Sequence, residues 1–223
     1  MSFDNLNHII SIIFFIVSFE AWAQTDTLID VKSVHPNLHI ALLYATHNNF
    51  LNEVIYTQNI CYLRKEAIAR LKKAGEYQKK YYPLYHLKIT DCHRPLSAQK
   101  KMWDKVKNTA KKKYIANPYT KFGSLHNYGL AIDITLEDDN KNELDMGTQV
   151  DFLGSLSERK LEKFHIEQKM LTLEQVKNRN ILREIMIKGG GFRSIDREWW
   201  HFEVFSGEET YKNYTKIEKW PAH

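Results

Sequence analysis

Residues 123–135 read GSLHNYGLAIDIT, and this stretch contains a histidine, His126, seven residues before an aspartate, Asp133. Two small residues, Gly129 and Ala131, lie between them, and the second half of the stretch has the β-branched residues that are typical of a strand. The two polar side chains have two interpretations. In the first, His126 lies in a loop, Asp133 lies at the end of a strand, and the two side chains never meet. In the second, both are ligands of a metal site that needs a further ligand elsewhere in the chain.

A third candidate ligand lies near the end of the chain, in the stretch REWWHFE, residues 197–203. Residues three apart on a strand point to opposite faces, so we expect Glu198 at a loop–strand junction and His201 just inside the strand. That arrangement aims both side chains at one point. A histidine beside tryptophans is by itself typical of a packed core. Together with His126 and Asp133, however, it completes a set of two imidazoles and one carboxylate that suits zinc and leaves a fourth position for water.

Length and composition favour one folded domain. The chain has 223 residues, of which 43% are hydrophobic and 26% are charged. This is enough for one packed core, whereas a second full domain would be cramped. No internal repeat or low-complexity linker divides the sequence. We therefore expect one domain over residues 24–223, preceded by a separate N-terminal segment, residues 1–23.

Hydrophobic periodicity predicts short strands mixed with helices. The segments with a strand pattern are residues 38–45, 85–91, 130–136 and 198–205. Helical patterns cover residues 62–80, a segment that begins at Ser97, and a segment that begins with a capping box at Thr172 and Gln175 and ends at Gly189. Because strands and helices do not alternate regularly, the pattern predicts an α+β fold, a single domain with a central antiparallel sheet flanked by helices.

Residues 1–23 have the pattern of a secretory signal peptide. The apolar run IISIIFFIVSF is too short to span a bilayer, and Ala21, Trp22 and Ala23 form the A-x-A spacing of a signal-peptidase site. The start of the segment lacks Lys and Arg, which departs from the pattern, and a buried N-terminal helix or anchor is the alternative. We expect an exported protein, periplasmic or secreted, that is cleaved near Ala23 and has no stable membrane span thereafter.

The chain is basic, with a formal net charge of +5. Cleavage after Ala23 would remove Asp4 and Glu20 and no basic residue, and would therefore raise the net charge to +7. Such a protein would be drawn to anionic polymers such as the cell wall or a membrane surface. Nucleic-acid binding is not expected, because the lysines are dispersed over helical faces, as in residues 64–80.

Two cysteines, Cys61 and Cys92, are too few for a disulfide scaffold. Export makes a single bridge possible, and the sequence leaves open whether the two residues meet. Neither cysteine lies in a C-x-x-C motif, so zinc binding by thiolates is not expected.

Several stretches resemble one known family. SLHNYGLAID and EWWH resemble the S-x-H-x-x-G-x-A-x-D and E-x-W-H signature of the zinc D-Ala-D-Ala peptidases, which include VanX-type dipeptidases and VanY-type carboxypeptidases. Further stretches resemble the dipeptidase branch: YATHNNF (44–50), CYLRKEA (61–67), DCHRPLSAQ (91–99) and ELDMGTQVDF (143–152). The resemblance spans residues 31–206. It implies a D-Ala-D-Ala peptidase/Hedgehog-like fold, one Zn²⁺ per chain and hydrolysis of D-Ala-D-Ala.

The resemblance also implies a role for each matching polar residue. The metal ligands would be His126, Asp133 and His201. The catalytic residues would be Glu198, as the general base, and Arg94, which would stabilise the transition state. The substrate-binding residues would be Asp145, which would hold the free amino group, with Ser124 and Tyr44 in the same pocket.

The chemistry of these residue types supports the same roles. Zinc with three protein ligands lowers the pKa of its water to about 7 and polarises the scissile carbonyl. A nearby carboxylate can take the water's proton, and a guanidinium is a permanently charged donor for the developing negative charge. Without the resemblance, Arg94 would be read as a surface arginine at the start of a helix. Gly129 and Ala131 would let the backbone approach the metal closely, although an ordinary tight turn into a strand explains them equally well.

The chain departs from the VanX pattern in two places. SLHNYGLA stands where VanX-type enzymes have S-R-H-S-R-G-S-A, and His93 replaces an aromatic residue before Arg94. Both bear on the width of the pocket. The two long matches YATHNNF and ELDMGT favour a dipeptidase that acts in wall turnover or recycling, with a small D-amino-acid dipeptide as substrate and contact with peptidoglycan. The alternatives are a D,D-carboxypeptidase or endopeptidase that acts on longer stem peptides, and a non-catalytic wall-binding module.

Overall fold

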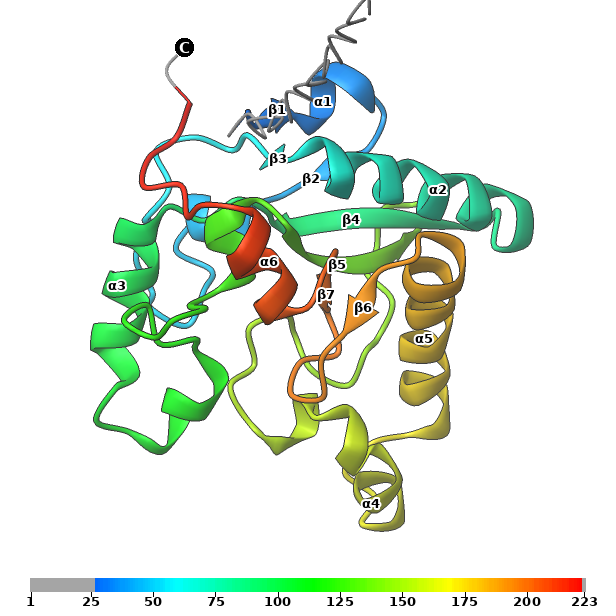
Figure 1. The fold of residues 1–223 in the computed structure, drawn as a ribbon. Helices are drawn as coiled ribbons and strands as arrows, with labels where there is room; N and C mark the ends of the chain where they lie inside the picture. The colour runs from blue at the N-terminus through cyan, green and yellow to red at the C-terminus, as the bar shows by residue number, and fades with distance from the viewer. Residues whose placement is uncertain (1–26, 222–223) are drawn as a thin grey trace, which may run out of the picture.

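A computed structural model describes residues 27–221, and a five-stranded sheet forms the centre of this region (Figure 1). The strands lie in the order β2-β4-β5-β7-β6. Within the described residues β2 and β4 are parallel, and the other neighbouring strands of this sheet are antiparallel. The strands are His39–Ile40 (β2), Tyr85–Asp91 (β4), Ala131–Asp138 (β5), Arg193–Ser194 (β6) and His201–Glu203 (β7), and a separate antiparallel pair joins Ile29–Asp30 (β1) to Tyr62–Leu63 (β3).

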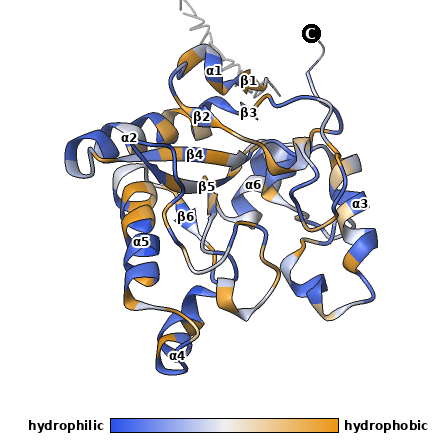
Figure 2. Ribbon diagram, turned by 180° about the vertical axis from the view of Figure 1, so that it is seen from behind, coloured by the Kyte–Doolittle hydropathy of each residue, from blue (hydrophilic) through white to orange (hydrophobic). Residues whose placement is uncertain are grey.

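Helices pack on the sheet and around its ends. The longest described helix, α2, runs along β4, and Figure 2 shows hydrophilic and hydrophobic residues alternating along α2 and α5. This is the pattern of helices with one face on the core. The α-helices are Val31–Val34 (α1), Lys65–Tyr81 (α2), Leu96–Val106 (α3), Glu162–Glu167 (α4), Leu173–Arg183 (α5) and Gly207–Asn213 (α6). The 3₁₀ turns are Leu43–Ala45 (η1), Ala110–Tyr114 (η2), Leu125–Tyr128 (η3), Ser155–Ser157 (η4) and Arg159–Leu161 (η5), and α5 continues into a π-helix, Glu184–Gly189 (η6).

The predicted α+β fold with a largely antiparallel central sheet is confirmed. The strand predicted at 85–91 is β4, and the strand predicted at 130–136 is β5. The capping box is also present: the Thr172 side chain accepts from the Gln175 backbone, and the Gln175 side chain accepts from the Thr172 backbone. Local sequence patterns therefore located the elements that form the middle of the sheet.

Three predicted elements are shorter than expected or differ in type. In the segment 38–45 only His39–Ile40 is a strand, because the Leu42 amide donates to the Asn59 side chain and the chain then turns into η1. The segment 62–80 begins as strand β3, which pairs with β1, and becomes helical only from Lys65. The segment 198–205 contributes only the three residues of β7.

Strand β5 lies third in the five-stranded order and is buried along nearly its whole length. Alternate residues of a strand point to opposite faces. Ile132, Ile134 and Leu136 face the hydrophobic core and are fully buried. The opposite face carries Asp133 and Thr135, which are buried as well. Polar side chains that are this deeply buried need hydrogen-bond or ion-pair partners, and the partners of Asp133 belong to the site described below.

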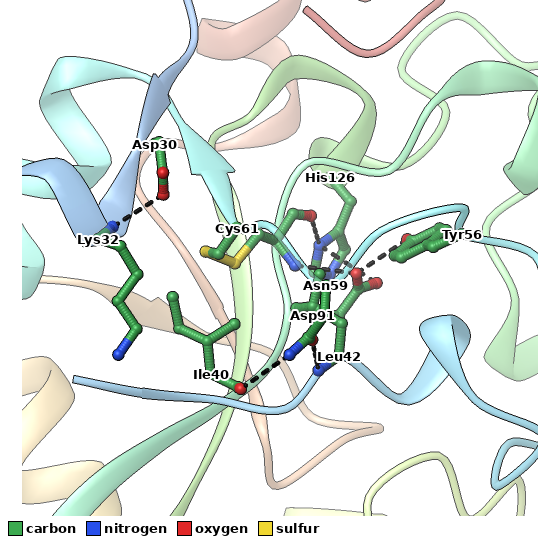
Figure 3. Close-up of a disulfide and its surroundings, with 10 residues drawn as sticks. Asp30, Lys32, Ile40, Leu42, Tyr56, Asn59, Cys61, Asp91 and His126 are labelled. Atoms are coloured by element: carbon green, nitrogen blue, oxygen red, sulfur yellow. Dashed lines mark hydrogen bonds and ion pairs between the residues drawn. A yellow bond between two sulfur atoms is a disulfide. The ribbon is translucent and has the colours of Figure 1, made fainter. Parts of the chain in front are cut away.

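The two cysteines form a disulfide, with Cα atoms 5.4 Å apart. The bridge joins Cys61, just before β3, to Cys92, just after β4, and both residues are fully buried. Figure 3 shows Cys61 with Asp91 and His126 close to it. The question that the sequence left open is therefore answered, and the bridge lies beside a predicted metal ligand.

Within residues 27–221, none of the helices combines the length and the apolar character that crossing a membrane requires. The signal-peptide prediction concerns residues 1–23, which lie outside the described residues.

Candidate metal centre and catalytic site

The three predicted metal ligands converge from two strands and one turn. Asp133 on β5 and His201 on β7 are directly opposite each other in the antiparallel register, so their side chains lie on the same face of the sheet. His126 comes from η3, the turn that leads into β5. Gly129 ends this turn with a φ of 67°, in the left-handed region that favours glycine, and a Cβ there would lie 2.6 Å from the side chain of Leu28.

The spacing of the ligand atoms fits a tetrahedral metal ion. Oδ1 of Asp133 lies 3.0 Å from Nδ1 of His201 and 3.3 Å from Nε2 of His126, and the two nitrogens are 3.1 Å apart. Contacts of 2.0–2.1 Å to a tetrahedral Zn²⁺ place the ligand atoms about 3.3–3.4 Å from one another. Each of the three residues is at least nine-tenths buried, and each offers one ligand atom to a common point. The donor set and its geometry therefore fit zinc.

Hydrogen bonds fix which nitrogen of each imidazole faces the metal position. Nδ1 of His126 lies 2.7 Å from the carbonyl oxygen of Cys92 and donates to it, which leaves Nε2 free to bind a metal (Figure 3). Nε2 of His201 lies 3.2 Å from Oε1 of Glu203 and donates to this carboxylate, which leaves Nδ1. Such outer partners orient metal-binding histidines and raise their basicity.

Glu198 lies beside the ligand set without joining it. Its Oε2 is 3.8 Å from Nδ1 of His201, the nitrogen that faces the metal position. Burial raises the pKa of Glu198 to about 8, and although the charge of His201 opposes this shift, the charge of Asp133 adds to it. A carboxylate this close to the ligand set, without belonging to it, has the placement of a general base. As predicted, it lies in the turn just before β7.

Arg94 is buried, so it is not the surface residue that its sequence context alone would suggest. Its Nε and Nη2 both donate to Oδ2 of Asp91, at 2.9 and 2.5 Å, and its Nη1 donates to Oε1 of Gln99 at 2.9 Å. The guanidinium lies 5.2 Å from the ring centroid of Tyr44, and Nη2 is 3.6 Å from Oδ2 of Asp133. A permanent positive charge is thus fixed next to the metal position, where it can stabilise an oxyanion.

A cavity of about 360 Å³ opens over this centre. Of the predicted site residues, those that line it are Tyr44, Arg94, Ser124, His126, Asp133, Glu198 and His201. Tyr44 reaches the cavity because the predicted strand 38–45 turns into η1 at this point. Ser124 precedes η3 and is nearly buried.

Asp151, which was not among the predicted site residues, also lines the cavity. Among the described residues, neither its buried Oδ2 nor the hydroxyl of Tyr44 has a hydrogen-bond partner of normal geometry. Burial raises the pKa of Asp151 to about 7; the interaction with the hydroxyl of Tyr44 opposes this shift, and the charge of Asp133 adds to it. The residue has a φ of 67°, which is rare for a residue other than glycine. A carboxylate in a cavity wall with an unsatisfied oxygen is a candidate binding group for a ligand in that cavity.

The structure does not bring Asp145 to the cavity. Its carboxylate accepts from the amide of Gly147 at 2.8 Å and from Nε2 of Gln175 at 2.9 Å. Both aspartates lie in the same quoted stretch, ELDMGTQVDF, and no local pattern distinguishes them. The outer carboxylate Glu203 was also missed, although its position two residues after His201 puts it on the same face of β7.

A buried set of two histidines and one aspartate, with a neighbouring carboxylate and a fixed guanidinium in a cavity wall, is the arrangement of a metallopeptidase. The sequence itself leads to a narrower assignment. Residues 24–219 match the sequence profile of the peptidase family described as D-Ala-D-Ala dipeptidase, and the chain belongs to this family.

Two curated relatives carry the same description. The D-alanyl-D-alanine dipeptidase of Escherichia coli (strain K12) is 35% identical over 182 residues, which cover 82% of this chain and 86% of that protein. The D-alanyl-D-alanine dipeptidase of Synechocystis sp. (strain ATCC 27184 / PCC 6803 / Kazusa) is 25% identical over 170 residues, which cover 63% of this chain and 68% of that protein. The chain is therefore a peptidase that matches these relatives over most of their length.

Two solved structures are more distant. The LdcB LD-carboxypeptidase, described in connection with peptidoglycan recognition, is 18% identical, with 79% of this chain and 71% of that chain covered and a TM-score of 0.36. A mutant of the vancomycin resistance D,D-pentapeptidase VanY, solved in complex with Zn(II), is 14% identical, with 70% of this chain and 81% of that chain covered and a TM-score of 0.33.

Proposed function

We propose that this protein is a zinc-dependent D-alanyl-D-alanine dipeptidase that hydrolyses D-Ala-D-Ala to two D-alanines. The observation that carries the proposal is the convergence of three ligand atoms, each within 3.3 Å of the others, at a cavity that also holds Glu198 and Arg94. One Zn²⁺ per chain would be held by Nε2 of His126, Oδ1 of Asp133 and Nδ1 of His201. These atoms have the spacing and the donor chemistry that zinc requires.

The protein residues divide the remaining work. Bound zinc would supply a Lewis acid at the scissile carbonyl and lower the pKa of a water molecule to about 7. Glu198 takes the proton of the attacking water and returns it to the nitrogen of the leaving amine. Arg94 donates to the carbonyl oxygen as negative charge develops there, and its bonds to Asp91 hold the guanidinium still during the reaction.

Asp151 is the group that we propose for the free amino end of the dipeptide. The sequence-based candidate for this role, Asp145, already uses its carboxylate to bind Gly147 and Gln175 and does not line the cavity. Asp151 does line it, and its buried Oδ2 accepts no hydrogen bond of normal geometry from the part of the chain that the structure describes. Tyr44 and Ser124 would contact the same substrate from the cavity wall.

The buried carboxylate of Asp151 also favours a dipeptide over a longer stem peptide. In a dipeptide the residue whose carbonyl is attacked carries a free ammonium group, which pairs with a carboxylate. In a longer peptide the same nitrogen is an uncharged amide, which cannot offer Asp151 an ion pair. The stretch SLHNYGLA, which resembles carboxypeptidases, keeps a D,D-carboxypeptidase or endopeptidase as the second candidate. A non-catalytic wall-binding module would not need the base and ligands, all of which are present.

We propose in addition that the protein is exported to the periplasm or beyond, with residues 1–23 as a signal peptide cleaved near Ala23. The disulfide between Cys61 and Cys92 supports this location, because such bonds persist mainly in oxidising compartments. Peptidoglycan contact would follow from the basic character of the chain at that location.

The test is a hydrolysis assay with the zinc-loaded protein and two substrates, D-Ala-D-Ala and N-acetyl-D-Ala-D-Ala, in which free D-alanine is measured. We expect release from D-Ala-D-Ala at a much higher kcat/KM than from the blocked substrate. Cleavage of the blocked substrate or of a pentapeptide stem, with no release from D-Ala-D-Ala, would establish the carboxypeptidase instead. A Glu198→Ala variant that binds zinc and keeps full activity would exclude the proposed mechanism with either substrate.

A further inference from the structure

Arg179 is a fully buried arginine that the proposed chemistry does not use. It lies on α5, and its guanidinium donates to three acceptors from different parts of the chain. Nε donates to the carbonyl oxygen of Met146 at 2.7 Å, and Nη2 donates to that of Leu156 at 3.0 Å. Nη1 donates to Oε1 of Glu162 at 3.2 Å, and this carboxylate balances the charge. One side chain therefore binds both ends of the segment 146–156.

The segment 146–156 is the part of the chain that carries Asp151. The residue just before this segment is also held by α5, because Nδ2 of Asn178 donates to the carbonyl oxygen of Asp145 at 3.0 Å. Between the two ends bound by Arg179, the described residues form no helix or strand until η4. Backbone carbonyls buried in such a loop need donors from elsewhere, and the guanidinium supplies two of them.

Asp151 depends on this support because its own conformation is unfavourable. Its φ of 67° lies in the left-handed region, which is unfavourable for a residue with a side chain. Among the described residues no hydrogen bond of normal geometry reaches its Oδ2, and the nearby hydroxyl of Tyr44 interacts with this carboxylate without fixing the backbone of the loop. A conformation of this kind persists only where the surrounding structure imposes it.

Arg179 also contacts the other side of the site. Its guanidinium lies 5.6 Å from the ring centroid of Trp199, the residue that follows Glu198. The indole nitrogen of Trp199 in turn donates to Oγ1 of Thr148, within the segment that Arg179 binds, at 2.8 Å. The loop with Asp151 and the turn with Glu198 are thus fixed against the same guanidinium.

We infer that Arg179 is a positioning residue that sets the selectivity for a free amino group by holding Asp151 toward the cavity. The inference rests on the role proposed for Asp151. A lysine in the same place would keep the charge but could not reproduce the planar fork that reaches Met146, Leu156 and Glu162 together. The neighbouring Arg183 binds both oxygens of the same Glu162, at 2.9 Å each, and is bonded to neither end of the segment. It is therefore a matched control.

The experiment compares the inhibition constants of two phosphinate analogues of D-Ala-D-Ala with the zinc-loaded protein, one with the amino group and one with hydrogen in its place. We expect the wild-type protein to bind the amino compound at least tenfold more tightly. Arg179→Lys should reduce this preference about tenfold, and Arg183→Lys should leave it within twofold. In an Asp151→Asn background, where the preference is already lost, Arg179→Lys should have no further effect on it.

The outcomes distinguish a failure of the role proposed for Asp151 from a failure of the role inferred for Arg179. If Asp151→Asn abolishes the preference and a folded Arg179→Lys protein retains it, the inference is wrong and the role of Asp151 stands. If the wild-type protein shows no preference, or Asp151→Asn retains it, the proposed role of Asp151 fails and the inference fails with it. Should Arg179→Lys not fold, Asn178→Ala decides the question: it loosens the chain at Asp145, just before the same segment, and a preference that does not fall about threefold overturns the inference.

Discussion

Reduction of the disulfide between Cys61 and Cys92 should destabilise the protein without dismantling the metal centre. The bridge joins residues 31 apart and ties the loop before β3 to the end of β4. The contact that it supports is the bond from His126 to the carbonyl oxygen of Cys92. This carbonyl is also positioned by the ladder between β4 and β5, which remains when the bridge is opened. Opening the disulfide should therefore lower the stability of the protein but leave its metal binding largely intact.

The magnitude follows from the length of the closed loop. Releasing a loop of this size in the unfolded chain returns entropy worth roughly 3–4 kcal/mol at 25 °C. The folded state loses little, because Cys61 and Cys92 are fully buried and free thiols pack as small hydrophobic groups. With an m-value of about 2–3 kcal/mol/M in urea, the midpoint of unfolding should fall by roughly 1–2 M.

The assay is urea unfolding of the zinc-loaded wild-type protein before and after reduction, followed by tryptophan fluorescence, with zinc content measured in parallel. A Cys61→Ala/Cys92→Ala variant is the control, since reductant should leave its midpoint unchanged. We expect the reduced wild-type protein to retain zinc and most of its activity at low urea concentration. An unchanged midpoint would refute the stability argument, and loss of zinc at the onset of reduction would refute the separation of the bridge from the metal centre.

Three further predictions concern the site and its surroundings. Glu203→Gln removes the carboxylate that orients His201 and should weaken zinc binding by roughly tenfold or more, measured by competition with a chelator; unchanged affinity would exclude this role. Arg94→Lys should retain zinc and lower kcat by about 10²-fold, since lysine cannot bind Asp91 twice and still face the oxyanion, and an unaffected kcat would contradict the assigned role. Burial lowers the pKa of His93 to about 4, so between about pH 6.5 and pH 4 the unfolded chain binds a proton that the folded protein does not. Stability should thus fall with decreasing pH, by about 3 kcal/mol over this window, and His93→Phe should remove that part of the loss in chemical denaturation; an equally steep loss in the variant would contradict the prediction.

The convergence of His126, Asp133, Glu198 and His201 could be predicted because their positions in the sequence are tied to a specific motif and to strand geometry. The register of β5 and β7 brings Asp133 and His201 together, and the short turn before β5 leaves His126 little freedom of placement. The position of Glu203 next to His201 could have been predicted in the same way, since alternate residues of a strand share a face.

The choice between Asp145 and Asp151 could not be made from the sequence. Both lie in one loop, and their positions are decided by helix α5, which packs against this loop from a distant part of the chain. Gln175 donates a hydrogen bond to the carboxylate of Asp145, and Arg179 binds the backbone on either side of Asp151. The length of β2 was overestimated for a similar reason, because a side chain outside the predicted strand, that of Asn59, ends the ladder.

The chain order of the proposed metal ligands has a consequence for how the protein would acquire zinc. Asp133 and His201 are neighbours on adjacent central strands but 68 residues apart in the chain, and β7 is the last strand of the described structure. Contacts of such high contact order form late in folding. A nascent or translocating polypeptide would therefore have no complete coordination sphere until nearly all of it has emerged. Metallation would then be among the final events of maturation, dependent on the zinc supply of the compartment in which folding finishes.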